Sequence, residues 1–293
     1  MRFLNRSAGR LSRHRRGRFA GLAVLLVALL VTGGAYAALA PAGQAEQSQD
    51  NAELVEQGRE LFLVGCSTCH GQNGEGVLDV NGNQLGPSLQ GVGGAAVDFQ
   101  VGTGRMPMVQ PGQQNPRKNV AYSDDETAAL AAFVQSLAPG PDVPDESDYD
   151  PSYIYDLPED ERDAAINRGQ QIFLTNCTAC HNFNGRGGAM PRGGYAPSLR
   201  GVSDKHIYEA MLTGPSQMDV FSDGNIPPEN KREVIAFLET LQEQPQQGGF
   251  SLGGLGPVGE GLYVFVVGIG GLVGFAVWIA AHTTRTKKGK ETA

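Results

Sequence analysis

Apolar side chains recur at helical spacing in four segments, which form two similar pairs. The segments are 52–64 and 124–137, followed by 159–174 and 228–241. In the first segment, Leu54, Leu61 and Phe62 are spaced as on one face of a helix. Ser123 precedes a run of three acidic residues at the start of the second segment and is expected to be its N-cap. The pattern predicts a mainly α-helical protein.

Two longer apolar stretches frame these segments, from Phe19 to Leu39 and from Gly261 to Ala281. Both are uncharged and long enough to cross about 30 Å of hydrocarbon as a helix. The second has Tyr263 and Trp278 near its ends, where aromatic side chains favour the membrane interfaces. Residues 261–281 are therefore predicted to be a transmembrane helix.

The first apolar stretch has two interpretations. Arginines precede it, and Ala35-Tyr36-Ala37 resembles a signal-peptidase site, as does Ala38-Leu39-Ala40. Residues 1–40 are thus either a signal that is removed or an anchor that is retained, and both interpretations stay open.

The basic residues gather at the two ends of the chain. Residues 1–18 hold seven arginines, and the tail 282–293 holds one arginine and three lysines. Positive charge stays on the cytoplasmic side, so residues 41–260 are expected outside the plasma membrane and the basic tail in the cytoplasm, with the N-terminus there too if the first apolar stretch is retained. Of the 23 basic and 31 acidic residues, this central part retains 12 and 30. Such an acidic body excludes nucleic-acid binding and favours a basic partner.

The chain contains an internal repeat. GRELFLVGCSTCHGQNGEG at 58–76 is similar to GQQIFLTNCTACHNFNGRG at 169–187, and GPSLQGV at 86–92 to APSLRGV at 196–202. A duplicated module of about 85 residues explains both pairs. The predicted parts are module one (50–138), an acidic, proline-rich linker (139–158), module two (159–242) and a glycine-rich tether (243–260). The linker is expected to be irregular.

All four cysteines lie in two copies of C-x-x-C-H. The copies consist of Cys66, Cys69 and His70, and of Cys177, Cys180 and His181. Two thiols on one helical turn, followed by a histidine, are typical of covalent haem attachment. The thiols add to the vinyl groups of haem, and the imidazole lies under the iron.

Three other uses of these cysteines are less consistent with the pattern. A redox dithiol leaves both histidines unexplained. A zinc site with four cysteine ligands needs the two pairs to meet, although they lie 111 residues apart in separate repeats. Disulfides across Cys-x-x-Cys are strained and uncommon as structural links.

Each module resembles a class I cytochrome c domain: a helix, C-x-x-C-H, a glycine-rich loop, G-P-x-L, a methionine and a closing helix. The resemblance implies two covalently bound haem c groups with His70 and His181 as axial iron ligands. It also implies that the carbonyls of Pro87 and Pro197 accept a hydrogen bond from the histidine Nδ1 atoms. Module two departs from the pattern, because Ala196 replaces the glycine of G-P-x-L.

The sixth iron ligand in module two is expected to be Met218, which follows Thr213-Gly214-Pro215 in a loop. Met211 lies in a predicted helix and is expected in the core, whereas Met190 comes too early in the family order. His206 is a weaker rival, because a lone histidine is more often a surface residue.

Two arguments conflict for the sixth ligand in module one. The repeat register aligns Met108 with Met218, whereas the family pattern favours Met106, which precedes Pro107. We favour Met106, because proline stiffens the loop that presents the sulfur atom. Met108 is the alternative.

Over nearly its full length the chain resembles the dihaem cytochrome c subunit of the actinobacterial cytochrome bcc complex. The stretches that carry this resemblance are AAVDFQVGTGRMP (95–107), CHNFNGRGG (180–188), MLTGPSQM (211–218) and the GGLGPVGEG tether. It implies an electron-transfer subunit of a quinol–cytochrome c reductase, with no independent substrate chemistry. Electrons would come from a Rieske iron–sulfur protein and leave to a cytochrome aa3-type oxidase, and a cytochrome b subunit would be a further partner.

Two alternative functions fit the same modules. One is the dihaem subunit of another membrane oxidase, such as the cbb3 type, or of a dehydrogenase. The other is a dihaem peroxidase, which needs one iron with an open or displaceable ligand.

Overall fold

The computed structural model describes residues 19–39, 42–112, 114–190, 193–243 and 257–288. The chain divides into a unit of residues 1–54 and a unit of residues 55–293, and each is considered by itself. The predictions for the arginine-rich start, for most of the tether and for the last five residues concern positions outside these ranges.

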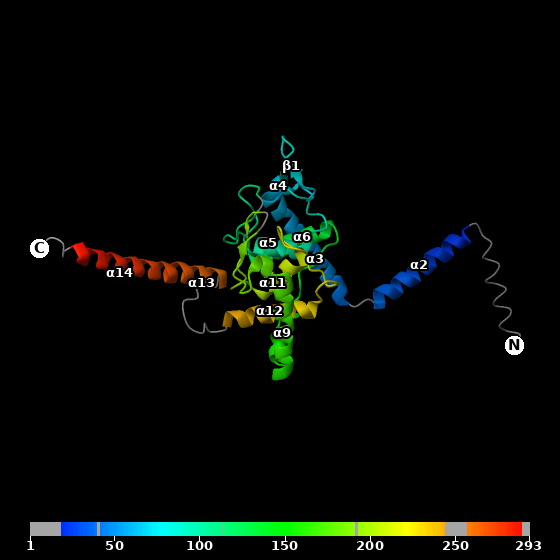
Figure 1. The fold of residues 1–293 in the computed structure, drawn as a ribbon. Helices are drawn as coiled ribbons and strands as arrows, with labels where there is room; N and C mark the ends of the chain where they lie inside the picture. The colour runs from blue at the N-terminus through cyan, green and yellow to red at the C-terminus, as the bar shows by residue number, and fades with distance from the viewer. Residues whose placement is uncertain (1–18, 40–41, 113, 191–192, 244–256, 289–293) are drawn as a thin grey trace. The chain divides into compact units, whose positions relative to one another are not determined.

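Along the chain, module one begins with the last turns of α3 (Ala42–Gly65) and ends with helix α6 (Asp124–Leu137) (Figure 1). The elements between them are α4 (Ser67–His70), β1 (Val77–Leu78), β2 (Gln84–Gly86) and α5 (Gly94–Gly102). Gly58 lies where α3 meets α6, and a Cβ atom there would overlap the carbonyl oxygen of Ala129. Since side chains set the distance between packed helices, glycine permits this close crossing.

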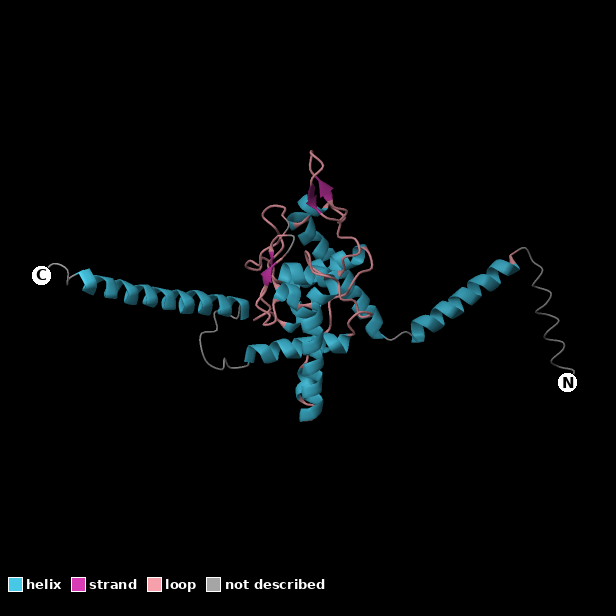
Figure 2. Cartoon of the chain, viewed as in Figure 1, coloured by secondary structure: helices cyan, strands magenta, loops and turns pink. Residues whose placement is uncertain are grey.

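Module two repeats this plan. Helix α9 (Glu159–Asn176) precedes the second pentapeptide, and α12 (Pro228–Glu243) closes the module. The elements between them are α10 (Thr178–His181), β3 (Gly188–Ala189), β4 (Tyr195–Ala196) and α11 (Asp204–Thr213). Gly169 lies on α9 where a Cβ atom would overlap the carbonyl oxygen of Glu233 on α12. Figure 2, in the same view as Figure 1, shows α12 running across α9.

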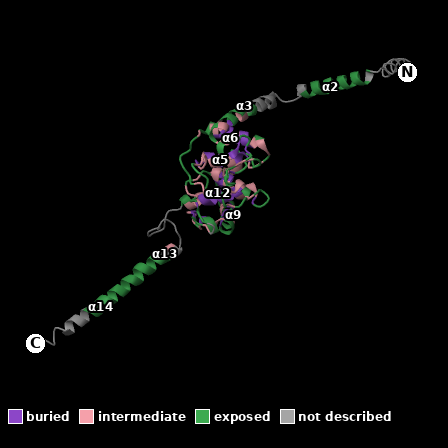
Figure 3. Cartoon of the chain, turned by 90° about the horizontal axis from the view of Figure 1, so that it is seen from above, coloured by how far each residue is buried: buried purple, intermediate pink, exposed green. Residues whose placement is uncertain are grey.

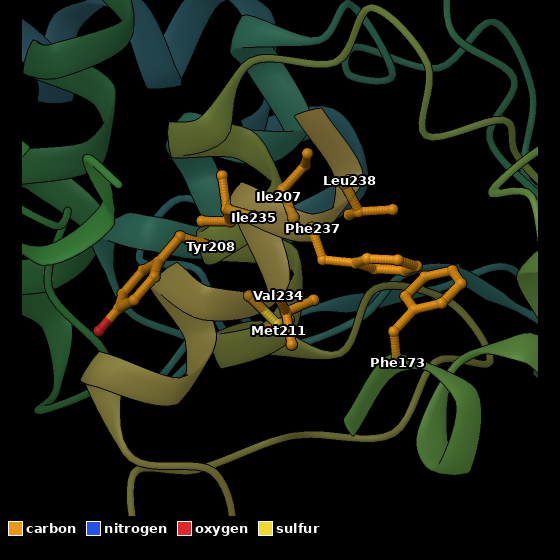
Figure 4. Close-up of a cluster of buried hydrophobic side chains, with 8 residues drawn as sticks. All are labelled: Phe173, Ile207, Tyr208, Met211, Val234, Ile235, Phe237 and Leu238. Carbon is orange, nitrogen blue, oxygen red and sulfur yellow. The ribbon is translucent and has the colours of Figure 1, made fainter. Parts of the chain in front are cut away.

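An aromatic pair lies beside each helix crossing. The ring centroids of Phe62 and Phe133 are 5.0 Å apart in module one, and those of Phe173 and Phe237 are 5.6 Å apart in module two. In Figure 4 the Phe173 ring extends from α9 toward Phe237, and the other labelled side chains come from α11 and α12. Met211 is 3% exposed within this cluster, in agreement with its predicted place in the core.

The predicted start of α6 is confirmed. Ser123 is its N-cap: the backbone N–H of Glu126 donates to Ser123 Oγ, and the Glu126 carboxylate accepts from the backbone N–H of Ser123. This reciprocal capping satisfies two backbone donors that the helix itself leaves unpaired.

Helix α3 is longer than predicted, because it begins at Ala42 rather than near residue 52. The added residues, AGQAEQSQDN, carry no apolar period, although alanine, glutamine and glutamate are good helix formers. A search for apolar spacing therefore misses them.

The prediction of an irregular linker is wrong for residues 146–155. This segment forms two short helices, α7 (Glu146–Tyr149) and α8 (Ser152–Tyr155). Ile154 is fully buried and lies against Ala165 of α9 and Ala236 of α12. Arg232 also donates a hydrogen bond to the Ser147 carbonyl, and the Tyr155 hydroxyl donates one to the Glu239 carboxylate. These scattered contacts join the linker to module two and leave no periodicity to detect.

The C-terminal apolar stretch is helical throughout. It comprises α13 (Pro257–Val264), a π-helical stretch (Phe265–Ile269) and α14 (Gly270–Lys288). Within it, residues 261–281 are long and apolar enough to cross a membrane, and their side chains are exposed (Figure 3). Helix α2 (Ala20–Leu39) holds a shorter apolar segment, Gly21–Tyr36.

Candidate haem-binding sites

The pentapeptide of module one forms a single helical turn directly after α3. Cys66 precedes the turn, and its carbonyl oxygen accepts hydrogen bonds from the backbone N–H groups of Cys69 (3.1 Å) and His70 (3.0 Å). The His70 side chain is buried, with 8% of the residue exposed. The turn therefore holds two thiols and a buried imidazole within five residues.

The same turn occurs in module two. The carbonyl oxygen of Cys177 accepts from the N–H groups of Cys180 (3.2 Å) and His181 (2.8 Å). His181 is 9% exposed. The two copies of the pentapeptide therefore have the same backbone geometry.

Each histidine has one ring nitrogen bonded to a proline carbonyl. His70 Nδ1 lies 2.8 Å from the Pro87 oxygen, and His181 Nδ1 lies 3.0 Å from the Pro197 oxygen. A carbonyl oxygen only accepts, so Nδ1 carries a proton, and in the neutral ring Nε2 keeps its lone pair. Burial lowers the pKa of His181, which favours the neutral imidazole. The two hydrogen bonds thus hold both rings with Nδ1 toward the proline carbonyl and leave Nε2 for a metal.

The small residue next to the proline differs between the modules. In module one a Cβ atom on Gly86 would overlap the carbonyl oxygen of Cys69, and Val77 faces Gly86 across the β1–β2 pair. In module two Ala196 takes this place, and its partner across β3–β4 is Gly188. In module two the glycine of this strand pair is thus on the opposite strand.

The first cysteine of each pair, Cys66 or Cys177, is a partly buried thiol. Burial raises the pKa of Cys66 to about 11 and that of Cys177 to about 12, and the neighbouring cysteine of each pair adds to the effect. A raised pKa keeps these two groups in the thiol form, whereas a redox-active cysteine has a lowered pKa. All four thiols are free, and no metal-compatible group among the described residues includes a cysteine.

A cavity adjoins the pentapeptide of module two. Cys177, Cys180, His181 and Met218 all line it. Much of the remaining lining is apolar, including Phe173, Leu199, Met211, Val234 and Leu238. An apolar cradle with two thiols, an imidazole and a thioether fits the porphyrin and iron of a c-type haem. Met190 and His206 also line the cavity, and Met211, which lines it too, is buried in the core cluster of module two.

Met106 and Met108 differ in their surroundings. Met106 packs against the core cluster of module one, which contains Phe62 and Leu130, and its backbone N–H donates to the Gln100 carbonyl at 2.8 Å. Met108 is not part of that cluster; its Cε atom lies near Gly112. This difference supports Met106 as the proposed sulfur ligand of the first haem.

Substitution of the two methionines in turn tests that choice. We expect Met106→Leu to remove the methionine–iron charge-transfer band of one haem, because leucine has no sulfur atom to bind iron. Met108→Leu is the matched control and is expected to keep the band. Absorbance spectra of the oxidised protein distinguish the two variants. If Met108→Leu loses the band and Met106→Leu keeps it, the ligand is Met108, as the repeat register suggests.

A polar cluster joins the two modules. Lys205 of α11 reaches across to Asp98 of α5, with Nζ 2.8 Å from Oδ2. Glu209 is fully buried beside them, and both of its carboxylate oxygens lack a hydrogen-bond partner among the described residues. His206 Nε2 lies 3.9 Å from Asp98 and from Glu209. Sequence reasoning missed this cluster, because it arises only where α5 and α11 pack together.

The expectation that His206 is a surface residue is wrong. Its side chain is 20% exposed, and its ring meets that of Phe99 edge to face at 6.1 Å. Burial lowers the pKa of His206, which favours the neutral ring. His206, Asp98 and Glu209 lie close enough for a metal ion, but the Lys205 ammonium already supplies the positive charge, so we assign no metal there.

The cluster makes stability depend on pH. Burial raises the pKa of Glu209 to about 10, and the Asp98 carboxylate adds to this. The folded state thus keeps a proton that an unfolded glutamate loses near its ordinary pKa of 4.5, so stability falls as pH rises between these values. Glu209→Gln is expected to stabilise the folded protein by about 1–3 kcal/mol above neutral pH.

Thermal unfolding at mildly acidic and mildly alkaline pH measures this effect. We expect the variant to lose less stability than the original chain as pH rises. Glu229→Gln, at an exposed position on α12, is the control. Its unfolding temperature should depend on pH as that of the original chain does. An unchanged slope for Glu209→Gln would mean that Glu209 ionises normally.

Both modules match known families. Residues 55–138 match the family described as Cytochrome c, and residues 164–238 match Cytochrome C oxidase, cbb3-type, subunit III. These ranges fall within the two modules predicted from the repeat.

Several curated proteins are similar over nearly the whole chain. A cytochrome bc1 complex cytochrome c subunit of Corynebacterium diphtheriae is 42% identical over 90% of this chain and 94% of its own length. The protein of the same description from Mycobacterium tuberculosis is 40% identical over 94% of this chain and 95% of its own. A cbb3-type cytochrome c oxidase subunit FixP of Bradyrhizobium diazoefficiens is 24% identical over 72% of this chain and 70% of its own.

Proposed function

Because this chain belongs to the family of cytochrome c subunits of the cytochrome bc1 complex, we propose that it carries electrons from a Rieske iron–sulfur protein to a terminal oxidase. It is the electron-transfer subunit of a quinol–cytochrome c reductase in the respiratory chain. Cytochrome b and the Rieske protein are its proposed neighbours in the complex, and an aa3-type oxidase is the proposed acceptor.

The observation that carries this proposal is the pair of C-x-x-C-H turns, each with an imidazole oriented by a proline carbonyl. Bound haem supplies the one-electron redox chemistry that no side chain here provides. The cysteines would hold it covalently, and His70 and His181 would ligate its iron atoms. Met106 and Met218 would supply thioether sulfur to the same irons, which favours a high reduction potential. A histidine and a methionine for each iron suit electron transfer.

Charge and hydrophobicity support a position at the membrane surface. The C-terminal helix is the proposed anchor, and the acidic modules are proposed to lie on the extracytoplasmic side, where a basic partner surface would attract them. The basic tail is then cytoplasmic. If the first apolar helix is retained, the N-terminus is cytoplasmic too.

Purification of the tagged chain in mild detergent tests the assignment. We expect b-type haem in the absorbance spectrum and a Rieske signal in electron paramagnetic resonance spectra of the preparation. Oxidase subunits should accompany them if the complex delivers electrons directly. A chain that purifies alone, with two haems and neither partner, would contradict membership of this complex but not the binding of two haems.

The same preparation distinguishes the peroxidase alternative. A peroxidase needs one iron with an open or displaceable ligand, and so gives a high-spin ferric signal from that haem. We expect low-spin signals from both haems.

A further inference from the structure

Part of module one covers the haem cavity of module two. Arg105, Gln114 and Arg117, all from module one, line the same cavity as Cys180 and His181. The residues belong to the segment between α5 and α6, which also holds Met106. Module two therefore does not enclose its own haem site.

Gln114 fastens this segment to module two. Its Nε2 atom donates to the carbonyl oxygen of Tyr195 at 2.7 Å, and its Oε1 atom accepts from the backbone N–H of Tyr195 at 3.1 Å. The side-chain amide thus binds both backbone groups of one residue of β4. This pairing places the segment at a defined position over the cavity.

Arg105 and Arg117 have no anionic partner among the described residues. Neither guanidinium lies within 4.0 Å of a carboxylate. Arg105 is half-buried, with its guanidinium carbon 4.6 Å from the centre of the Phe99 ring, and the charge of Arg117 acts on it unfavourably. A partly buried cation beside a like charge is costly unless an anion compensates it.

The haem itself carries the missing anions. Each haem has two propionate carboxylates, and the planar guanidinium group matches a carboxylate with two parallel hydrogen bonds. Among the described residues that line this cavity, the arginines and lysines all come from module one. We infer that Arg105, assisted by Arg117 at the exposed side, binds the propionates of the second haem. The inference rests on the two haems of the proposed function.

This arrangement couples the two haem sites through one stretch of backbone. Arg105 directly precedes Met106, the proposed sulfur ligand of the first haem. The segment thus presents a sulfur atom to one haem and a cation to the other, which fixes the two sites relative to each other. A cation beside a haem favours its reduced form, so Arg105 raises the reduction potential of the second haem.

A redox titration of the purified complex tests this assignment. Arg105→Gln is expected to change the equilibrium between oxidised and reduced second haem by roughly threefold to tenfold, which lowers its midpoint potential by about 30–60 mV at 59 mV per tenfold change. Arg117→Gln should lower it less, because Arg117 is exposed. Arg105→Lys keeps the charge and should restore most of the potential. The first haem is expected to keep its potential.

A control variant and a second measurement make the result decisive. Arg59→Gln removes a charge from an exposed part of α3, where Arg59 pairs with Glu56, and should leave both potentials unchanged. Redox-induced infrared difference spectra report the propionates directly, and we expect their carboxylate bands to shift in Arg105→Gln. If both haems titrate but neither the second potential nor these bands change, the inference is wrong. Absence of either haem from the unsubstituted protein would instead contradict the proposed function.

Discussion

Replacing Cys177 and Cys180 together with serine is expected to leave the chain with one covalent haem instead of two and to stop electron transfer through the complex. A serine hydroxyl does not form the thioether bond, so the second haem is not retained when the protein is denatured. The cavity of module two would also lose the group that its apolar side chains surround. A haem-stained denaturing gel and the ratio of c-type haem to protein measure the loss, and quinol-dependent oxygen uptake measures the function.

Two matched variants accompany this experiment. The Cys66→Ser/Cys69→Ser double variant should lose the other haem and the same activity, because electrons need both sites. Thr178→Ala changes the same helical turn but removes only a hydroxyl that bonds the Leu174 carbonyl, so it should keep both haems. Full haem content in either double serine variant would contradict the assignment of the four cysteines.

Gly169→Ala is expected to destabilise module two by about 3 kcal/mol, because overpacking at a tight contact forces the backbone apart. The new Cβ atom would overlap the carbonyl oxygen of Glu233, which belongs to the backbone of α12 and has no rotamer to adopt. In an open helix the same change would stabilise by nearly 1 kcal/mol, since alanine is the better helix former. The sign of the effect therefore decides whether the crossing is as close as described.

Thermal unfolding of the purified protein, followed by circular dichroism, measures this effect. Gln170→Ala, at the next and exposed position of α9, is the control and should leave the unfolding temperature nearly unchanged. Gly58→Ala should destabilise module one in the same way, through the carbonyl oxygen of Ala129. Variants at Gly58 and Gly169 that unfold at the original temperature would contradict the close packing of these helices.

The sequence alone determined the features that depend on local pattern. Apolar spacing located α6, α9 and α12 within two residues, and the acidic turn after Ser123 marked the start of α6. The C-x-x-C-H pentapeptides, read with the repeat, predicted two covalent haems. These features were accessible because each lies within a short stretch of the chain, where spacing and residue type are sufficient evidence.

Only the tertiary structure decided which residues of one module meet the other. Asp98 and Lys205 are 107 positions apart, and Gln114 and Tyr195 are 81 apart, so no local pattern links them. The buried Glu209 and the half-buried Arg105 look in sequence like ordinary surface charges. Their environment comes from the packing of α5 and the following segment against α11 and β4. Packing between segments that are distant in the chain produces no periodic pattern of residues, so the sequence does not reveal it.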